Sequence, residues 1–135
     1  MSTVSRKVKD LMVGKEKLIT LNADASISDA AKVMEENNVG SVLIVEEGKL
    51  KGIFTERDIV RAIAKDIPVT EKLGNIMTTD IITVYEDDYL SKAVYIVSEK
   101  GIRHLPVTDK EGNLVGIISA KDLAKYYSEY IEAFE

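Results

Sequence analysis

The stretch Gly52-Ile53-Phe54-Thr55-Glu56-Arg57-Asp58 returns later in the chain as Gly116-Ile117-Ile118-Ser119-Ala120-Lys121-Asp122. In both copies an apolar run reaches a hydroxyl residue, and a carboxylate follows three positions later. This order predicts that a strand ends, and a helix begins, at Thr55 and again at Ser119. An element that recurs in such detail indicates an internal repeat.

The similarity between the two halves extends outward over about fifty residues with only small gaps. Residues 9–12 align with 74–77, residues 18–21 with 81–84, and residues 48–58 with 112–122. Between these blocks, Ala30 aligns with Ala93 and Val39 with Ile102. The chain therefore contains two copies of one structural unit.

The sequence pattern of each copy predicts secondary-structure elements in the order β-α-β-β-α. In the first copy a strand at 19–21 precedes a helix capped by Ser26 and Asp29, and a hairpin over 42–55 has Gly48 in its turn. The helix carries an apolar stripe at helical spacing, formed by Ile27, Ala30, Ala31 and Met34.

The second copy repeats these signals. A strand at 82–84 precedes a helix that Gly101 ends, and strands at 104–108 and 114–119 form a hairpin. Its helical stripe consists of Leu90, Ala93, Val94 and Val97. Residues 62–72, with Pro68 as a break, join the copies.

A unit of about sixty residues with one three-stranded sheet buries too little apolar surface to be stable alone. We therefore expect an α+β (mixed α/β) fold in which the two copies, residues 8–64 and 73–125, pack with pseudo-twofold symmetry. Two equivalent clefts would lie between them, and residues 126–135 would extend the last helix.

The composition limits the class of protein. The chain has 135 residues, 45% of them hydrophobic and 30% charged, and its net charge of −5 falls entirely in residues 68–135. This charge argues against a nucleic-acid or membrane-surface binder. There is no cysteine and only one histidine, His104, which excludes thiolate and His-rich metal sites and leaves few catalytic constellations. Because no signal peptide or membrane span is evident, we expect a soluble, cytoplasmic protein that is not an enzyme.

The two corners at Thr55 and Ser119 allow two interpretations. A hydroxyl N-cap with an acid at N3 serves any helix start, so capping alone explains the pattern. A helix N-terminus at a strand end also favours phosphate, and an Asp beside it can accept hydrogen bonds from ribose hydroxyls. The recurrence of the whole corner favours nucleotide binding, with capping as the alternative.

The two G-h-h-[ST]-x-x-D corners, together with Ile-Arg-His-Leu-Pro-Val at 102–107, resemble a tandem pair of CBS domains, a Bateman module. The resemblance covers roughly residues 8–125. It implies a disc-like regulatory sensor that binds AMP, ADP, ATP or S-adenosylmethionine in clefts between the repeats and signals to a partner protein. It also implies association of two such pairs as a homodimer.

The resemblance implies site residues in both copies. Around Asp58 they are Thr55, Arg57, Asp58, Ile82, Thr83, Ile102, Arg103, His104 and Pro106. Around Asp122 they are Ser119, Lys121, Asp122, Ile19, Thr20, Val39, Gly40 and Ser41. The two aspartates would hold ribose hydroxyls, Thr55 and Ser119 would lie near ribose or phosphate, and apolar and backbone groups would hold adenine.

The two implied sites differ in charge. Arg103 and His104 suit phosphate, whereas Gly40 and Ser41 at the matching positions carry no charge. We therefore predict that the Asp58 site is the better nucleotide site. The alternatives are a surface ion pair for Arg103 and a structural role for His104.

Two further features have competing interpretations. The run Glu86-Asp87-Asp88 suggests a divalent cation, but a solvated helix N-terminus is the more common role, and we predict no metal site. An apolar stripe in the tail either packs on its own core or mediates self-association, which its tyrosines favour. The stripe consists of Leu123, Tyr126, Tyr127, Tyr130, Ile131 and Phe134.

The sequence leaves one functional alternative to ligand sensing open, a protein-interaction scaffold whose corners are only helix caps. An enzyme is disfavoured because a single histidine without cysteine leaves few base–nucleophile pairs.

Overall fold

The two sequence repeats build two structural units, and each unit combines the core of one repeat with the segment that leads into the other. A computed structural model describes residues 6–132. The central unit is Ile19–Ile81, and the terminal unit consists of the chain before and after it. The borders of the central unit, at Ile19 and Ile81, lie in the aligned blocks 18–21 and 81–84.

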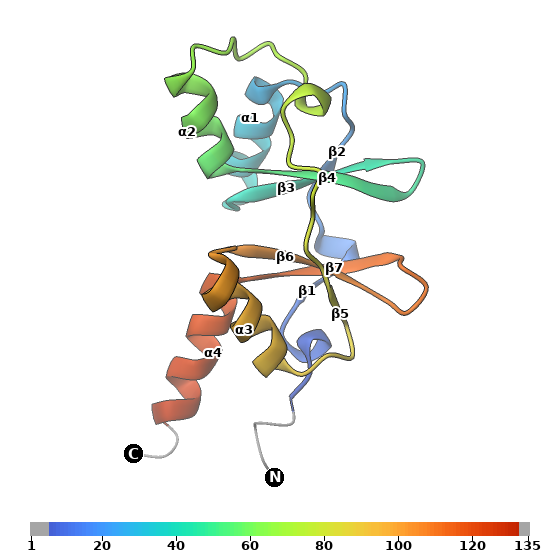
Figure 1. The fold of residues 1–135 in the computed structure, drawn as a ribbon, viewed down its shortest axis with the longest axis vertical. Coiled ribbons are helices and arrows are strands. Elements are labelled where there is room, and N and C mark those ends of the chain that lie inside the picture. Colours follow the sequence, from blue (N-terminus) through green and yellow to red (C-terminus); the bar gives the residue numbers. More distant parts are fainter. Residues whose placement is uncertain (1–5, 133–135) are drawn as a thin grey trace. The chain divides into compact units, whose positions relative to one another are not determined.

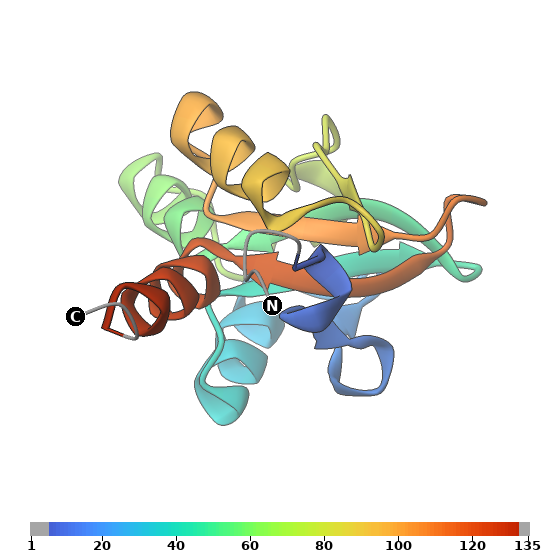
Figure 2. The same cartoon turned by 90° about the horizontal axis from the view of Figure 1, so that it is seen from below.

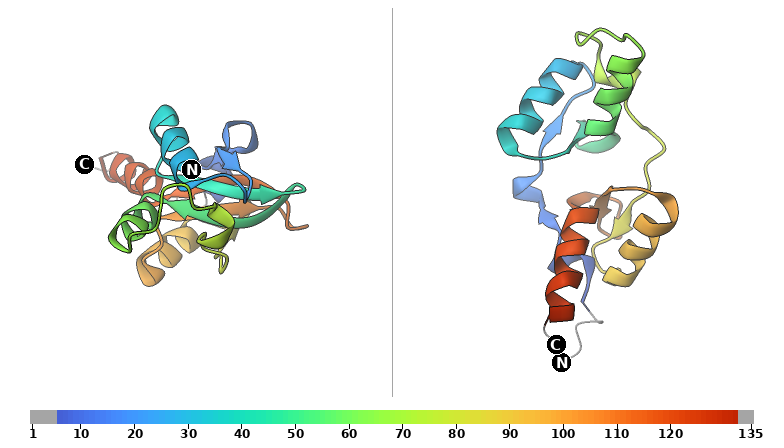
Figure 3. Two further views of the ribbon diagram at one scale, coloured as in Figure 1. Left: turned by 90° about the horizontal axis from the view of Figure 1, so that it is seen from above. Right: turned by 90° about the vertical axis from the view of Figure 1, so that its left-hand side faces the viewer.

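The central unit contains β2 (Thr20–Leu21), α1 (Ile27–Asn37), β3 (Ser41–Glu46), β4 (Lys49–Thr55), α2 (Glu56–Ala64) and the short 3-10 helix η4 (Leu73–Asn75). Its sheet has the order β2-β3-β4, with β2 parallel and β4 antiparallel to β3. Both helices lie on the same side of this sheet (Figure 1; Figure 3, right). They bury one core, formed by Ile27, Ala30, Met34, Val42, Ile44, Phe54, Ala62 and Leu73.

The terminal unit contains η2 (Val8–Asp10), β1 (Val13–Gly14), η3 (Lys15–Lys17), β5 (Val84–Tyr85), α3 (Leu90–Lys100), β6 (His104–Thr108), β7 (Leu114–Ser119) and α4 (Ala120–Glu132). Its sheet has the order β1-β7-β6-β5, and the N-terminal segment runs beside the β6–β7 hairpin (Figure 2). Its core consists of Val8, Val84, Leu90, Ala93, Leu105, Val107, Ile118, Leu123 and Tyr126.

Two leader segments, residues 6–14 and 71–78, dock in the same way on the two units. The carbonyl of Glu71 accepts a hydrogen bond from the N–H of Ile27 at 3.1 Å, and that of Arg6 accepts from Leu90 at 3.0 Å. Ile27 and Leu90 are the first residues of α1 and α3, whose N–H groups have no acceptor inside their own helices. Each leader therefore completes the helix start of the repeat that it does not belong to.

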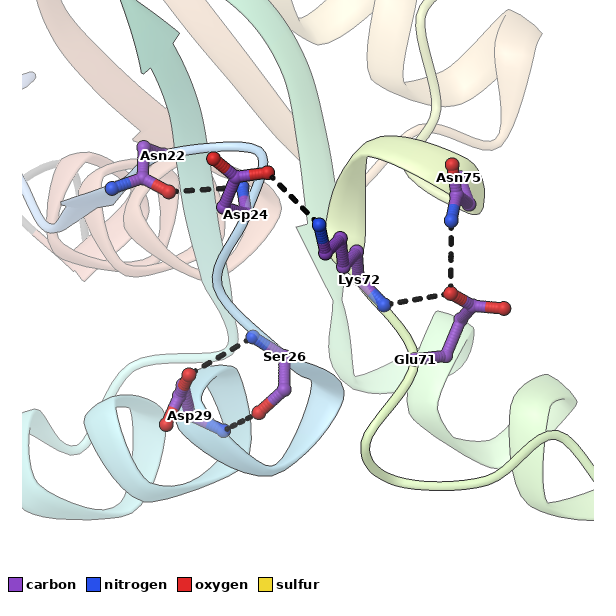
Figure 4. A network of polar contacts seen from close by, with 7 residues as sticks. All are labelled: Asn22, Asp24, Ser26, Asp29, Glu71, Lys72 and Asn75. Carbon is purple, nitrogen blue, oxygen red and sulfur yellow. Dashed lines mark hydrogen bonds and ion pairs between the residues drawn. The ribbon is translucent and has the colours of Figure 1, made fainter.

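Polar contacts hold the second leader to the loop before α1 (Figure 4). Lys72 Nζ lies 3.5 Å from Asp24 Oδ1, and the side chain of Glu71 accepts hydrogen bonds from the N–H of Lys72 and from Asn75 Nδ2. Beside them the N–H of Ser26 donates to Asp29, and the N–H of Asp29 donates to the Ser26 hydroxyl.

Most of the expected elements are confirmed. The α+β class, the doubled β-α-β-β-α order and the hairpins at β3–β4 and β6–β7 are present. Ser26 and Asp29 form the predicted capping box, and Gly101 ends α3 in the left-handed conformation. Left-handed Gly48 and Gly112 lie in the two hairpin turns.

Three expectations need correction. The second sheet has four strands, because Val13 and Gly14 pair with β7. The strand expected at 82–84 is β5, Val84–Tyr85, where hydrogen bonding to β6 begins. The connection expected to start at 62 begins after Ala64, because α2 continues to that residue.

The start of the C-terminal stripe packs on its own unit. Leu123 and Tyr126 are buried, Tyr127 packs against the same core, and the Tyr126 and Tyr127 rings meet edge to face at 5.0 Å. The side chains of Tyr130 and Ile131, and all of Phe134, lie outside the described part of the chain. The described residues of the stripe thus favour the core interpretation over self-association.

Candidate functional site

In the central unit the corner forms where β4 passes into α2 (Figure 1). The backbone N–H of Thr55 donates to Asp58 Oδ2 at 2.9 Å, and the Thr55 hydroxyl donates to the same oxygen at 3.2 Å. The other carboxylate oxygen, Oδ1, lies 3.7 Å from Nη1 of Arg61. Only 13% of the Asp58 side chain is exposed. One oxygen of this shielded carboxylate therefore serves the helix cap, and the other faces the exposed guanidinium of Arg61.

The corner in the terminal unit uses its hydroxyl differently. The N–H of Ser119 donates to Asp122 Oδ2 at 3.1 Å, and the N–H of Asp122 donates to the Ser119 hydroxyl oxygen at 3.1 Å. A hydroxyl that accepts a hydrogen bond keeps its own proton for another acceptor. In both corners the cap uses Oδ2 of the aspartate and not Oδ1. The corners differ in the hydroxyl proton, which Thr55 donates to Asp58 and which Ser119 does not donate to its cap.

Each corner lies beside two residues of its own repeat that were expected in a ligand site, Gly40 and Ser41 in the first repeat and Arg103 and His104 in the second. Ser41 pairs with Thr55 across the β3–β4 ladder, and the carbonyl of Gly40 accepts from the N–H of Glu56 at 3.1 Å. In the terminal unit His104 pairs with Ser119, and the carbonyl of Arg103 accepts from the N–H of Ala120 at 2.8 Å.

The implied sites combine residues of both units. Thr55, Arg57 and Asp58 belong to the central unit, whereas the other six members of the Asp58 site belong to the terminal unit. In the Asp122 site, Ser119, Lys121 and Asp122 belong to the terminal unit, and the other five members belong to the central unit. These two groupings remain predictions.

The remaining expected site residues are distributed between surface and core. Arg57 and Lys121 are exposed near the starts of α2 and α4, and Arg103 is exposed before β6. Pro106 is buried within β6. Thr20, Val39 and Thr83 are exposed, whereas Ile19, Ile82, Ile102 and His104 are half-buried.

A pocket that the sequence analysis missed lies along α2, and we call it the α2 pocket. Its volume is about 260 Å³, and it lies wholly within the central unit. Its lining residues are Phe54, Asp58, Arg61, Ala62, Lys65, Ile67, Ile76 and Thr78. In the sequence, the spacing of Asp58, Arg61 and Lys65, which places them on one helix face, could have indicated one wall of this pocket. The other wall comes from residues 67–78, whose return to α2 has no local sequence signature.

The capping bonds alone do not mark a ligand site. The same bond from an N–H to a carboxylate three residues later occurs from Lys7 to Asp10, from Ser26 to Asp29 and from Tyr85 to Asp88. At Asp29 the backbone N–H of Ser26 holds the carboxyl pKa below its ordinary value. Asp58 differs from an ordinary cap such as Asp10, whose side chain is 39% exposed, in its burial and in its position on a pocket.

Asp87 and Asp88 of the acidic run at 86–88 form ion pairs with lysines, and Asp88 also accepts a backbone hydrogen bond just before α3. Asp87 Oδ1 lies 3.0 Å from Lys9 Nζ, and this contact lowers the pKa of Asp87 and raises that of Lys9. Asp88 accepts from the N–H of Tyr85 at 2.8 Å and lies 3.5 Å from Lys92. Among the side chains that the structure describes, residues 6–128, no three His, Asp or Glu gather as metal ligands would, and no described helix is long and apolar enough to cross a bilayer.

The comparison with known families now identifies the repeat. A family model of the CBS domain matches residues 8–65 and matches again over residues 73–129. The chain belongs to the CBS domain family. Its two copies are a CBS domain pair.

Solved structures and relatives of known sequence resemble this CBS pair over most of its length. The CBS domain pair of protein MJ0100, solved with 5′-methylthioadenosine and S-adenosyl-L-methionine, is 32% identical with a TM-score of 0.84 and covers 93% of this chain and 98% of its own. CBS domain protein PAE2072 from Pyrobaculum aerophilum, solved with AMP, is 28% identical with a TM-score of 0.79 and covers 87% and 89%. A 17.7 kDa protein of Acidianus ambivalens is 37% identical over 110 residues.

Several relatives are longer than this CBS pair. The matched region spans 81% of this chain and 66% of the Acidianus protein. It spans between 20% and 24% of three archaeal proteins named homoserine O-acetyltransferase. In those proteins a similar segment is joined to a much longer chain.

Proposed function

We propose that this CBS pair is a non-catalytic regulatory module that binds an adenosine-containing ligand and passes its state of occupancy to a partner protein. The observation that supports this most is the similarity, at 32% and 28% identity, to CBS proteins solved with S-adenosylmethionine, 5′-methylthioadenosine or AMP. AMP, ADP, ATP and S-adenosylmethionine are the candidate ligands.

In this proposal the aspartates of the corners hold the ribose. Asp58 has an oxygen, Oδ1, that is not used by the helix cap, and a vicinal diol donates well to a carboxylate. Asp122 takes the equivalent role in the terminal unit, where the Ser119 hydroxyl can donate to ribose or phosphate. The further residues named for each site in the sequence analysis would line the adenine and the phosphate, with Arg103 and His104 on the Asp58 ligand.

Thermal unfolding of nucleotide-free protein tests the proposal. A ligand at a hundredfold its dissociation constant stabilises the folded state by about 2.7 kcal/mol. That corresponds to a rise in melting temperature of roughly 5–10 °C for a chain of this size. We expect such a rise with at least one of AMP, ADP, ATP, S-adenosylmethionine and 5′-methylthioadenosine. No rise with any of these ligands, tested to millimolar concentration, would contradict the proposal.

A second candidate is an interaction scaffold, and we propose that a homodimer underlies it. Val60 and Ile63, three residues apart on α2, are 67% and 62% exposed. Such side chains favour a contact with a second copy. Sedimentation of Val60→Glu with Ile63→Glu tests this: loss of a dimer supports the contact, and a dimer that persists argues against it.

A further inference from the structure

The α2 pocket combines an apolar interior with positive charge. Phe54, Ala62, Ile67 and Ile76 supply its apolar surface, and Phe54 is fully buried. Two cations, Arg61 and Lys65, line it together with a single carboxylate, Asp58. Its lining therefore carries one net positive charge beside the proposed ribose ligand Asp58, in a protein whose total charge is −5.

Arg61 can exchange its present contact for a ligand anion. Its Nη1 lies 3.7 Å from Asp58 Oδ1, and its side chain is 60% exposed. An ion pair this long and exposed contributes little free energy, so the guanidinium is easily released. A phosphate offers the guanidinium a shorter, bidentate contact. A ribose that takes Oδ1 of Asp58 would at the same time free Arg61 for that contact.

The size of the pocket fits one end of a nucleotide. Its volume of about 260 Å³ is slightly smaller than the roughly 300–1,000 Å³ of sites that enclose a whole small molecule. Arg61 and Lys65 follow Asp58 by three and seven residues, Arg61 within α2 and Lys65 directly after it. A ribose at Asp58 whose 5′ substituent enters this pocket would bring a 5′-phosphate to these two cations.

We infer that the α2 pocket selects adenosine ligands with a 5′-phosphate over those with an uncharged 5′ group, through contacts of Arg61 and Lys65 with the phosphate. The inference rests on the proposed function, because it starts from a ribose bound at Asp58. The positions aligned with Arg61 and Lys65 in the second repeat are Lys125 and Glu129, so the pair of cations is not repeated in the sequence. We therefore expect selection for a 5′-phosphate only at the Asp58 corner.

The affinity ratio of AMP to 5′-methylthioadenosine tests this selection. Both ligands carry adenine and ribose, and only AMP carries a phosphate, so effects transmitted through Asp58 cancel in the ratio. In calorimetric titrations of the full nucleotide-free chain we expect Arg61→Gln and Lys65→Gln each to weaken AMP about tenfold. The affinity for 5′-methylthioadenosine should change less than about twofold.

Controls separate charge from folding and from the second corner. Arg61→Lys keeps the charge and should keep most of the AMP preference, whereas Lys32→Gln removes a cation from α1, outside the α2 pocket, and should change neither affinity. Repeating the titrations with Asp122→Asn removes the contribution of the second corner.

The outcomes distinguish the inference from the proposed function. If both ligands bind and Arg61→Gln and Lys65→Gln leave their affinity ratio unchanged, the inference is overturned and the proposed function stands. If no adenosine ligand binds the unmodified chain, the proposed function fails and the inference fails with it.

Discussion

Gly116 lies so close to Met12 that a Cβ added to this glycine would come within 2.6 Å of the methionine Sδ and within 2.6 Å of the Val13 carbonyl oxygen. Gly52 has the same relationship to Met77 in the central unit. The two glycines begin the repeated corners, and the two methionines belong to the leaders. A missing side chain in each strand thus creates the space in which the other repeat's leader docks.

Gly116→Ala should therefore destabilise the fold by about 1–3 kcal/mol, because the new methyl group must displace Met12 or the backbone of β1. Gly14→Ala is a matched control in β1, since its Cβ would meet only the end of the Glu16 side chain at 3.4 Å. Urea unfolding measures both. A Gly116→Ala chain as stable as the Gly14→Ala chain would show that the leader is not packed as closely as described.

Asp58→Ala should weaken adenosine-ligand binding more than Asp122→Ala, since Asp58 carries the proposed ribose contact of the better site. Both changes also remove a helix cap, at a cost of about 0.5–2 kcal/mol in stability. Asp29→Ala removes the same kind of cap from α1, away from the α2 pocket, and should leave affinity unchanged. Isothermal titration gives the order of the three affinities, and a greater loss with Asp122→Ala would reverse our ranking of the sites.

Local sequence signals predicted the elements that short-range forces specify. The capping box of Ser26 and Asp29 acts within three residues, and Gly101 ends α3 because it adopts a positive φ without strain. The strand ends at Thr55 and Ser119 were equally visible, because each combines a strand end with a helix cap. The same chemistry left capping and ligand binding indistinguishable at Asp58 and Asp122.

The parts that sequence could not supply depend on contacts between distant segments. β1 has two residues, Val13 and Gly14, which are too few to show a period, and its partner β7 lies far along the chain. The α2 pocket needs Ile67, Ile76 and Thr78 to return to α2, and no local pattern encodes that path. The apolar stripe that includes Tyr126 has the same spacing whether it faces its own core or another chain.

Tyr126→Ala should lower the free energy of unfolding by about 2–4 kcal/mol, because a large buried ring leaves a cavity. The ring also contacts Tyr127 at 5.0 Å and lies 5.7 Å beneath the Arg6 guanidinium. Arg6→Gln, which removes only the cation, should cost less than about 1 kcal/mol. The oligomeric state should not change. A Tyr126→Ala chain that dissociates into smaller species with undiminished stability would instead support the self-association interpretation of the tail.

The stability of the fold should be flat near neutral pH and fall in acid. Hydrogen bonds to the ionised carboxylates lower the pKa of Asp29, Asp87 and Asp109, the first through the Ser26 N–H, the second through Lys9 and the third mainly through the Asn113 N–H. A carboxyl whose pKa is lower in the folded chain binds a proton more readily after unfolding. Its stabilisation is therefore complete above about pH 5 and is lost as the pH falls through about 4 toward the folded pKa.

Urea unfolding between about pH 7 and pH 2.5 measures this dependence. Asp109→Asn removes one contributing carboxylate and should make the decrease shallower, while Lys110→Gln, in the same turn, should leave the carboxyl hydrogen bonds in place. Because these carboxylates are exposed, each contributes modestly, and the decrease should be gradual rather than a single step. A stability that rises between about pH 5 and pH 3 would mean that carboxylate repulsion in this acidic chain outweighs these hydrogen bonds.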